Sequence, residues 1–432
     1  MGKLRKIASV AAKACRSPFY GFIEGHSELT SRELAEIGAL VGKGQPDVVT
    51  VYEEKFASLV GNGECVAFAA GRMGFFAIMQ LLGIGAGDEV ILPGATCSVM
   101  VNAVLRVGAI PVYADIDRET LGSSPSSITK CITAKTRLIV AQHSFGIPCD
   151  IAPIREIASS RGIFLLEDSA LTLGSEVNGV AVGNFGDAAL FSTDHTKPLN
   201  TLIGGLIYSR DGSLISKLRH FRDACPDLPV DRQKALWRRL RFERLVCRPD
   251  RHGWFGLLDA ASGVANSVTG KEGAFLTDDF RSLPGSRYPY PARLPAFIAR
   301  LGLTQAEDWG KKKQLRKEIL RQILSVVEAS PMRHCISPAY RDLRLDIVPL
   351  RFAWVADEPG SRNHFSAYID TSWTWFMQPI VATNEPLSNF GYRAGCCPIS
   401  EDVGLRVVNV PCNVRQDHVS GLMKLLSETI NC

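Results

Sequence analysis

Two kinds of hydrophobic pattern alternate between about residues 63 and 210 of the chain. Short apolar runs rich in β-formers stand at ECVAFAA, DEVILP, IPVYADI, TRLIVAQHS and IFLLEDS, and a final pair follows at DAALFS and GGLIYS. Between them, segments such as MGFFAIMQLL, SVMVNAVLRVG and IAPIREIASSRG have the apolar spacing of helices. Strands that alternate with crossover helices indicate a mainly parallel sheet covered on both faces. The pattern therefore predicts an α/β fold.

The alternation ends after about residue 213. The segment 213–285 contains the Arg-rich helical stretch KALWRRLRFERLVCRPDRHGW, which we interpret as a solvated amphipathic helix rather than a lipid or partner surface. Helical spacing then continues through 292–329, a length that suits a connector between domains. The remainder has the strands LDIVPLRFAWV and RVVNVP and closes with the amphipathic helix DHVSGLMKLLSETI, which predicts a small α+β domain.

The chain has 432 residues, more than one hydrophobic core usually supports. We expect an N-terminal arm at 1–45, a large α/β domain at 46–290 with an insertion at 213–285, a connecting helix at 291–330 and a small α+β domain at 331–432.

Composition and charge exclude several classes of protein. Apolar residues make up 46% and charged residues 22% of the chain, a globular balance. The net charge of +5 is small for this length, and no basic block is interleaved with aromatic residues, so we expect no nucleic-acid partner. The twelve cysteines are scattered without a CxxC pair, which favours reduced thiols in the cytoplasm. We predict no metal site.

The opening MGKLRKIASVAAKACRS has too short an apolar stretch for a signal peptide, and no run of about 18 apolar residues occurs in the chain. Its basic helical pattern could lie on an anionic membrane. A solvated helix or a subunit-packing arm is the favoured interpretation.

Polar residues that follow strands are the candidates for chemistry, because parallel sheets bind ligands at the carboxyl ends of their strands. The strand IFLLEDS ends in Glu167 and Asp168. A carboxylate there could hold a protonated ring nitrogen, since a neighbouring positive charge keeps a partly buried acid ionised. Capping of the following turn explains the residue equally well at this stage.

The loop FSTDHTK places Ser192 and Lys197 after another strand. A lysine whose pKa is lowered by desolvation can form a Schiff base with an aldehyde, although most loop lysines are only solvated charges. Ser192 could donate to a phosphate or cap a turn. The turn AAGRMG, with Gly71 and Arg72, precedes a helix, and a helix N-terminus is a ready anion site.

His143 ends a further strand and could be an ordinary structural histidine. Taken together, an anion site, a carboxylate, a serine and a lysine at strand ends of one sheet suggest a phosphorylated carbonyl cofactor. Pyridoxal phosphate (PLP) fits this description, because the protein supplies a lysine, an acid for the ring nitrogen and a phosphate cup.

Several ordered segments resemble the DegT/DnrJ/StrS family of PLP-dependent sugar aminotransferases. They are GIGAGDEVILPGATCSVMVNAVLRVGAIPVYADID, HSFGIPCDI, LLEDSALTLGS, FSTDHTKPLNTLIGG and FGYRAGCCPISEDVGLRVVNVPCNVRQDHVSGLMKLL. The resemblance implies the PLP-dependent transferase fold type I, with a large α/β domain and a smaller C-terminal α+β domain.

By this resemblance Lys197 is the Schiff-base lysine, Asp168 the partner of the pyridine nitrogen and Ser192 a phosphate ligand. The resemblance also places Gly71 and Arg72 at the phosphate-binding turn. It further implies a contact of Ala170 with one ring face, and contacts of His143 and Arg293 with the substrate.

Some positions depart from the family pattern. Cys97 stands where the family commonly stacks an aromatic ring on the cofactor, Leu171 replaces a glutamine, and Pro291, Ala292 and Arg293 replace an Asn-Tyr-Arg segment that reaches the phosphate of the neighbouring subunit. The loop after the lysine differs as well, with Pro198, Leu202 and Ile203. The cofactor contacts are therefore expected to be partly rebuilt.

The resemblance implies an aminotransferase that moves an amino group from glutamate or a similar donor to a keto-sugar, nucleotide-activated, in surface polysaccharide or specialised sugar biosynthesis. It also implies a homodimer. Two alternatives stay open: another PLP reaction on a sugar, such as dehydration, and a non-catalytic protein that keeps the fold for binding.

Overall fold

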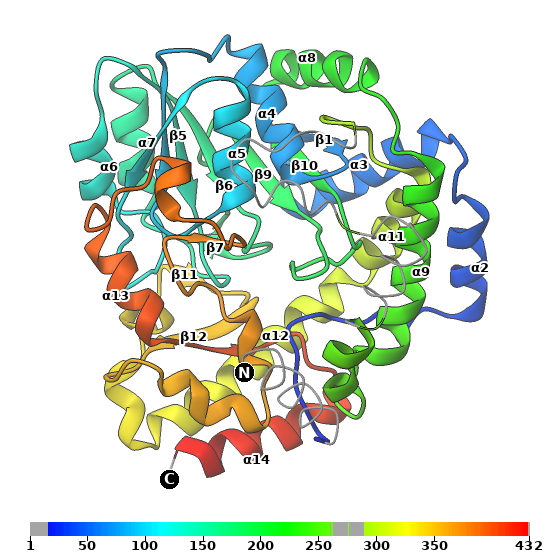
Figure 1. Ribbon diagram of the computed structural model, residues 1–432, viewed down its shortest axis with the longest axis vertical. Coiled ribbons are helices and arrows are strands. Elements are labelled where there is room, and N and C mark those ends of the chain that lie inside the picture. The colour runs from blue at the N-terminus through cyan, green and yellow to red at the C-terminus, as the bar shows by residue number, and fades with distance from the viewer. Residues whose placement is uncertain (1–15, 260, 262–274, 276–288, 431–432) are drawn as a thin grey trace.

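The computed structural model describes residues 16–259, 261, 275 and 289–430 (Figure 1). At its centre lies a seven-stranded sheet in the order β1-β10-β9-β6-β5-β2-β4. Only β10 runs antiparallel to its neighbours in this sheet, so the predicted mainly parallel sheet is confirmed. The strands are β1 (Glu64–Phe68), β2 (Glu89–Pro93), β4 (Ile110–Ala114), β5 (Thr136–Gln142), β6 (Phe164–Asp168), β9 (Ala188–Ser192) and β10 (Gly205–Ser209).

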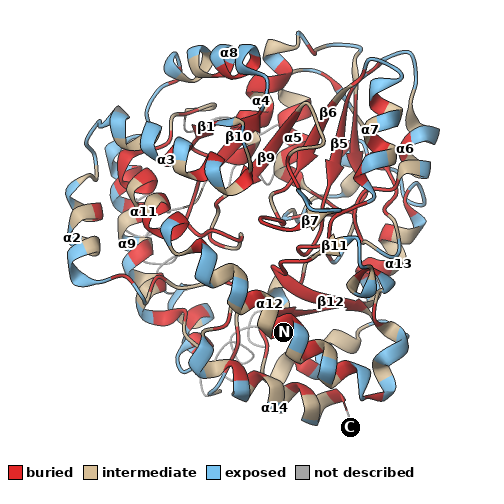
Figure 2. Cartoon of the chain, turned by 180° about the vertical axis from the view of Figure 1, so that it is seen from behind, coloured by how far each residue is buried: buried red, intermediate tan, exposed pale blue. Residues whose placement is uncertain are grey.

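Helices cover both faces of the sheet. Successive residues along a strand point to opposite faces and therefore contact different helices. Ile91, Ile139 and Leu165 point to the face covered by α6 (Pro125–Cys131) and α7 (Ile151–Ser159). The residues one position along, such as Val90 and Leu166, join the larger core under α4 (Gly71–Leu81), α5 (Ser98–Arg106) and α8 (Gly212–Asp223). Two-sided burial explains why the strands read as continuous apolar runs. Figure 2 shows the strands of the sheet mainly as buried, whereas the surrounding helices have both buried and exposed residues.

The predicted connecting helix is two helices, which corrects the expectation of a single one. They are α11 (Ala296–Glu307) and α12 (Trp309–Glu328), which meet at Asp308. Phe297 and Leu301 of α11 pack in the core of the large domain, whereas Ile319 and Ile323 of α12 pack in a separate core. The change from one core to the other therefore falls between the two helices.

This second core belongs to the small domain, whose α+β character is confirmed. An antiparallel pair, β12 (Arg351–Val355) and β14 (Val407–Pro411), packs with α12 and with α14 (Val419–Ile430), while α13 (Pro398–Arg406) leads into β14. Short strands tie the small domain to the large one. β13 (Ile380–Val381) pairs with β3 (Thr96–Cys97), and β11 (Leu345–Asp346) pairs with β7 (Glu176–Val177), next to β8 (Val180–Ala181).

The described part of the N-terminal arm runs across both domains. Phe19 and Tyr20 are buried, and Tyr20 bridges to Ile369 of the small domain. The arm then forms α2 (Ser31–Ala39), whose start is fixed by a capping box between Thr30 and Glu33. Helix α3 (Pro46–Val60) follows and packs on α11. The basic opening at 1–15, for which membrane contact is one interpretation, lies outside the described residues.

The Arg-rich helix α9 (Val230–Val246) has the solvated face that the charge pattern predicted, with Lys234, Arg238 and Arg241 exposed, but its other face buries polar residues that the pattern did not indicate. It buries Arg232, Gln233 and Glu243 beside Leu236 and Leu240. Buried charge demands partners inside the protein, and a partner of Glu243, His195, lies in the loop that carries Lys197. Much of the predicted insertion, 260 and 262–285 apart from 275, lies outside the described residues. In the part of the chain that the structure describes, no helix is both long and apolar enough to span a bilayer.

Candidate active site

Asp168 closes β6 at the centre of the sheet and is almost fully buried. Its Oδ1 accepts a 3.0 Å hydrogen bond from the Ala170 N–H. Asp168 therefore caps the turn that follows the strand, which is one of the two roles considered for it from the sequence. Among the described residues its Oδ2 has no hydrogen-bond partner. Burial raises the pKa of Asp168, and the Ala170 N–H, Lys197 and His143 pull it partly back. The second oxygen leaves room for a ligand donor.

The start of α4 lies against the sheet two strands away. Ala70 provides no side-chain cap for this helix, so Gly71 and Arg72 begin it without an acidic or hydroxyl partner at the N-cap. A Cβ on Gly205 of β10 would fall 2.2 Å from the Gly71 nitrogen. The helix start therefore depends on two glycines in close contact, and it has no side-chain cap that would compete with an anion for its N–H groups.

Lys197 lies in a tight loop between β9 and β10. Its backbone N–H donates to the Asp194 carbonyl at 3.0 Å, and Thr201 closes the loop through bonds from its N–H and its hydroxyl to the Thr193 carbonyl. Leu202 is held at φ 73°, a conformation rarely adopted by residues with a side chain. The loop is thus a strained and closely bonded unit rather than a flexible surface loop.

The amine of Lys197 interacts with three side chains, Asp168, Cys97 and Trp375. Its charge acts on both Asp168 and Cys97, lowering the pKa of each against the effect of burial. Its Nζ lies 5.4 Å from the centre of the Trp375 ring, which comes from the small domain. The lysine and the acid therefore lie together in a region to which the small domain also contributes.

The contacts that hold the lysine loop in place have no signal in the sequence pattern. His195, two residues before Lys197, is buried, and its Nδ1 lies 2.9 Å from Oε1 of Glu243 on α9. Arg239 Nε donates to the same oxygen at 2.7 Å. Burial alone would raise the pKa of Glu243, but His195 and Arg239 outweigh it and lower that pKa to about 2. The Arg-rich helix thus holds the loop through a buried ionised triad.

A second set of contacts holds the other end of the loop. The Asn200 amide donates to the Glu24 carbonyl at 2.8 Å, and Arg316 of α12 donates to the Pro198 carbonyl at 2.9 Å. The Glu24 carboxylate accepts from Arg316 and from Lys312. Because these partners lie far from the loop in sequence, only the fold could bring them to it.

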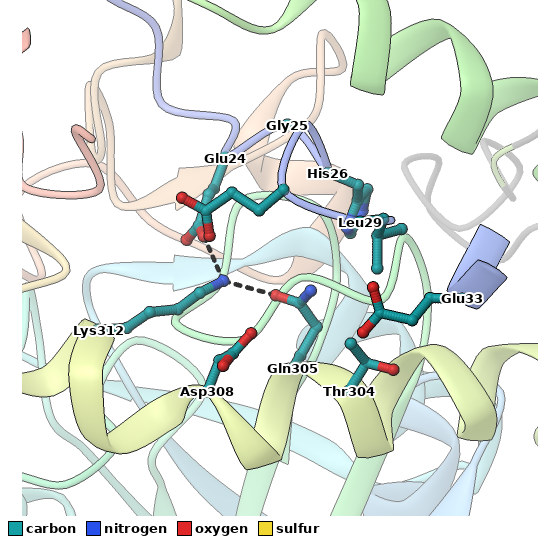
Figure 3. A pocket seen from close by; sticks show the side chains of 10 residues that line it. Glu24, Gly25, His26, Leu29, Glu33, Thr304, Gln305, Asp308 and Lys312 are labelled. Carbon is teal, nitrogen blue, oxygen red and sulfur yellow. Dashed lines mark hydrogen bonds and ion pairs between the residues drawn. The ribbon is translucent and has the colours of Figure 1, made fainter. Parts of the chain in front are cut away.

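Glu24 and Lys312 also line a small polar pocket between the arm and the end of α11 (Figure 3). There Lys312 donates to Glu24 and, at 2.7 Å, to Gln305. The pocket lies beside the supports of the lysine loop. It contains neither Lys197 nor Asp168.

Two predicted substrate residues have partners within the protein. His143 is fully buried: its Nδ1 accepts the Cys149 N–H at 3.0 Å and its Nε2 lies 3.1 Å from Glu167. Since a backbone N–H occupies Nδ1, the ring carries its proton on Nε2, toward the carboxylate. Arg293 makes a bidentate pair with Asp227, both distances being 2.9 Å. Their contacts with substrate stay predictions that these bonds do not support.

The remaining predicted residues line the same region. Ser192 ends β9, and its Oγ lies 3.5 Å from the Asp194 nitrogen, a long bond that leaves the hydroxyl available. Ala170 is half-buried after Asp168, and Leu171, which departs from the family pattern, is buried. Pro291 begins the return from the insertion, and the neighbouring Tyr290 hydroxyl donates to the Arg72 carbonyl at 3.3 Å.

These residues fit PLP. A buried carboxylate with one oxygen unpaired can take the N–H of a pyridinium, and an uncapped helix start built on Gly71 and Gly205 can take a phosphate. Lys197 supplies the amine. The poorest part of the fit is Cys97, which offers no ring face to a flat ligand.

Comparisons with known proteins agree with this geometry. Residues 32–240, about half of the chain, match the model of the DegT/DnrJ/EryC1/StrS aminotransferase family. A GDP-perosamine synthase from Escherichia coli O157:H7 is 38% identical over 171 residues, which cover 40% of this chain and 47% of that protein.

A dTDP-4-dehydro-2,3,6-trideoxy-D-glucose 4-aminotransferase from Saccharopolyspora spinosa is 34% identical over 199 residues, 46% of this chain and 51% of that protein. The chain thus spans about half the length of the curated relatives it matches.

Similarity of fold extends much further along the chain. The PLP form of the sugar aminotransferase Spr1654 from Streptococcus pneumoniae, itself described as putative, superposes with a TM-score of 0.65 at 17% identity, over 96% of this chain and 97% of that one. The predicted fold, including the small C-terminal domain, is therefore confirmed.

Proposed function

Because residues 32–240 belong to the DegT/DnrJ/EryC1/StrS aminotransferase family, we propose that this chain is a PLP-dependent aminotransferase. It transfers an amino group from glutamate or a similar donor to a keto-sugar carried on a nucleotide. The observation that supports this best is the meeting of Lys197 with a buried Asp168 that keeps one carboxylate oxygen unpaired. The names of the two sugar-related relatives support a nucleotide-linked substrate.

Four parts of the chain would hold the cofactor. Lys197 would bind it through the side-chain amine, and Asp168 would accept the N–H of its ring. The first turn of α4, with Arg72, and the Ser192 hydroxyl would bind its phosphate. When bound, PLP supplies a ring that takes up negative charge from the amino-acid carbon.

The protein's own groups would then control protons. The carboxylate of Asp168 would keep a proton on its ring partner, because a neutral amide in its place could not stabilise the positive charge. The long side chain of Lys197 would let Nζ carry a proton between neighbouring positions of the site. The fixed loop around Lys197 limits where that amine can travel, so proton movement would be confined to one face.

We further propose that the enzyme works in the cytoplasm as a homodimer. Closed two-fold assembly is the commonest arrangement of soluble oligomers. Pro291 and Arg293 are partly exposed, and they occupy the positions of the family segment that reaches the phosphate of the neighbouring subunit. Here, however, Arg293 forms an ion pair with Asp227. Another cation would therefore neutralise the phosphate, and we assign this role to Arg72 in the first turn of α4.

The test is the visible absorption spectrum of the purified protein with PLP. We expect a band from cofactor bound to Lys197 that glutamate or glutamine bleaches and a nucleotide-linked keto-sugar restores. Lys197→Ala should lose the band, while Lys217→Ala, which removes an exposed lysine of α8, should keep it. A band that no amino donor bleaches would favour the non-catalytic alternative, and conversion of a sugar without amine transfer would favour a different PLP reaction.

A further inference from the structure

Trp375 is the aromatic side chain that the described structure places beside Lys197. Its ring centre lies 5.4 Å from the lysine Nζ, within the range at which a cation and an aromatic face attract each other. The residue belongs to the small domain, in the segment between β12 and β13. A residue from the small domain therefore forms part of the wall around the amine.

Cys97 belongs to the same neighbourhood as Trp375. Beyond Trp375 the chain enters β13, where Ile380 and Val381 pair in parallel with Thr96 and Cys97 of β3. Cys97 and Trp375 pack against one apolar cluster that includes Phe376 and Val381. The thiol is also within the electrostatic influence of Lys197 and Arg72. The two side chains thus border one space, and only Trp375 brings a ring to it.

The backbone of Trp375 is fixed by the small-domain sheet. Its N–H donates to Asn409 Oδ1 at 2.8 Å, and Arg351 Nη1 donates to the same oxygen at 3.2 Å. Asn409 and Arg351 stand on the paired strands β14 and β12. A ring on such an anchored segment is pre-organised, so little side-chain entropy is lost when a ligand stacks on it.

The indole N–H of Trp375 adds a second indication of a ligand. The Nε1 atom is buried and has no hydrogen-bond partner among the described residues. Buried indole donors usually find an acceptor. An acceptor on a molecule bound next to Lys197 would satisfy this donor.

We propose that Trp375 provides the aromatic surface for the flat ring of the cofactor at this site, in the role that the small Cys97 thiol cannot perform. The proposal rests on the proposed function, since it assumes that Lys197 holds PLP. Offset stacking between aromatic rings requires a partner ring with centroids about 4.5–7 Å apart, and a thiol presents no such face. The small domain would thereby help to bind a cofactor that the large domain anchors.

The experiment is equilibrium dialysis of PLP against wild-type protein and four variants, with far-ultraviolet circular dichroism to confirm folding. Trp375→Ala should weaken PLP affinity by about 3- to 10-fold, the range expected for loss of one aromatic pair. Trp375→Phe should stay close to wild type. Adding Cys97→Tyr to Trp375→Ala should recover affinity, because it returns a ring to the border of the same space that Cys97 forms.

The control is Trp254→Ala, which removes an exposed indole elsewhere and should not change PLP affinity. Wild-type affinity in Trp375→Ala would overturn the proposal. So would a loss that Trp375→Phe shares and that Cys97→Tyr does not repair, because the side chain would then act only as scaffold. If the wild-type protein itself fails to retain PLP, the proposed function fails instead, and the two failures are therefore distinguishable.

Discussion

Glu243→Gln is the change that tests most directly whether the Arg-rich helix positions Lys197. The substitution keeps the volume of the side chain but removes the charge that His195 and Arg239 share. The second oxygen, Oε2, is buried without a hydrogen-bond partner among the described residues, so an amide N–H₂ at that place would also find no acceptor among them. We therefore expect the loop to loosen although nothing in it has been mutated.

The free-energy cost of Glu243→Gln can be estimated because Glu243 and His195 form a buried ion pair. Removing one partner of a buried ion pair costs about 3–5 kcal/mol. Glutamine can still accept one hydrogen bond from His195, which favours the lower end, about 3 kcal/mol. Since about 1.4 kcal/mol is a factor of ten, local opening of the loop should become more frequent by about two orders of magnitude.

Hydrogen–deuterium exchange of the peptide covering 194–200 measures this opening. The Lys197 N–H, bonded to the Asp194 carbonyl, should exchange about 10²-fold faster in Glu243→Gln. Asp231→Asn is the matched control, because it makes the same change of charge on the same helix at an exposed position. Equal exchange in the two variants would refute the idea that α9 holds the loop.

The pH dependence gives an independent check. The pKa of Glu243 is lowered to about 2 from 4.5, so its stabilisation is present above pH 4.5 and is lost as pH falls toward 2. Burial alone would lower the pKa of His195, but Asp194 and Glu243 raise it above 6.5. That contribution is complete below pH 6.5 and is lost as pH rises through the raised pKa. Wild-type protection of the loop should therefore fall on the alkaline side of pH 6.5, and Glu243→Gln should show a smaller decline, because only Asp194 is then left to raise the pKa of His195.

Four further outcomes are expected. Lys197→Ala should abolish covalent attachment of PLP with the fold intact, and borohydride reduction that labels another lysine would contradict this. Asp168→Asn should retain PLP but lose transamination by orders of magnitude, because an amide cannot hold the pyridinium proton; near-normal turnover would show that Asp168 only caps the turn. Gly205→Ala should displace the start of α4, since its Cβ would lie 2.2 Å from the Gly71 nitrogen, and inorganic phosphate should no longer compete with PLP. Mass measurement across a dilution series should give a homodimer, and a monomer that turns over would refute a shared site.

The sequence alone determined the sheet and the residues at its strand ends. Apolar runs such as those ending at Asp168 and Ser192 have a local physical cause, because a strand buried on both faces must be apolar throughout. The turn residues that follow such runs are placed at one edge of a parallel sheet by topology. The positions of Lys197, Asp168 and Gly71 at that edge therefore follow from local pattern.

Only the tertiary structure decided what surrounds these residues. The charge pattern of α9 indicated a solvated helix, because a sequence does not show that Glu243 and His195, 48 positions apart, meet in a buried pair. The same holds for Trp375, which lies 178 positions from Lys197 and reaches it only because β13 pairs with β3. Local pattern specifies an element and its buried face, whereas contacts between distant elements depend on how complete surfaces pack. For that reason the positions of the candidate residues at the strand ends were predictable and the contacts that support them were not.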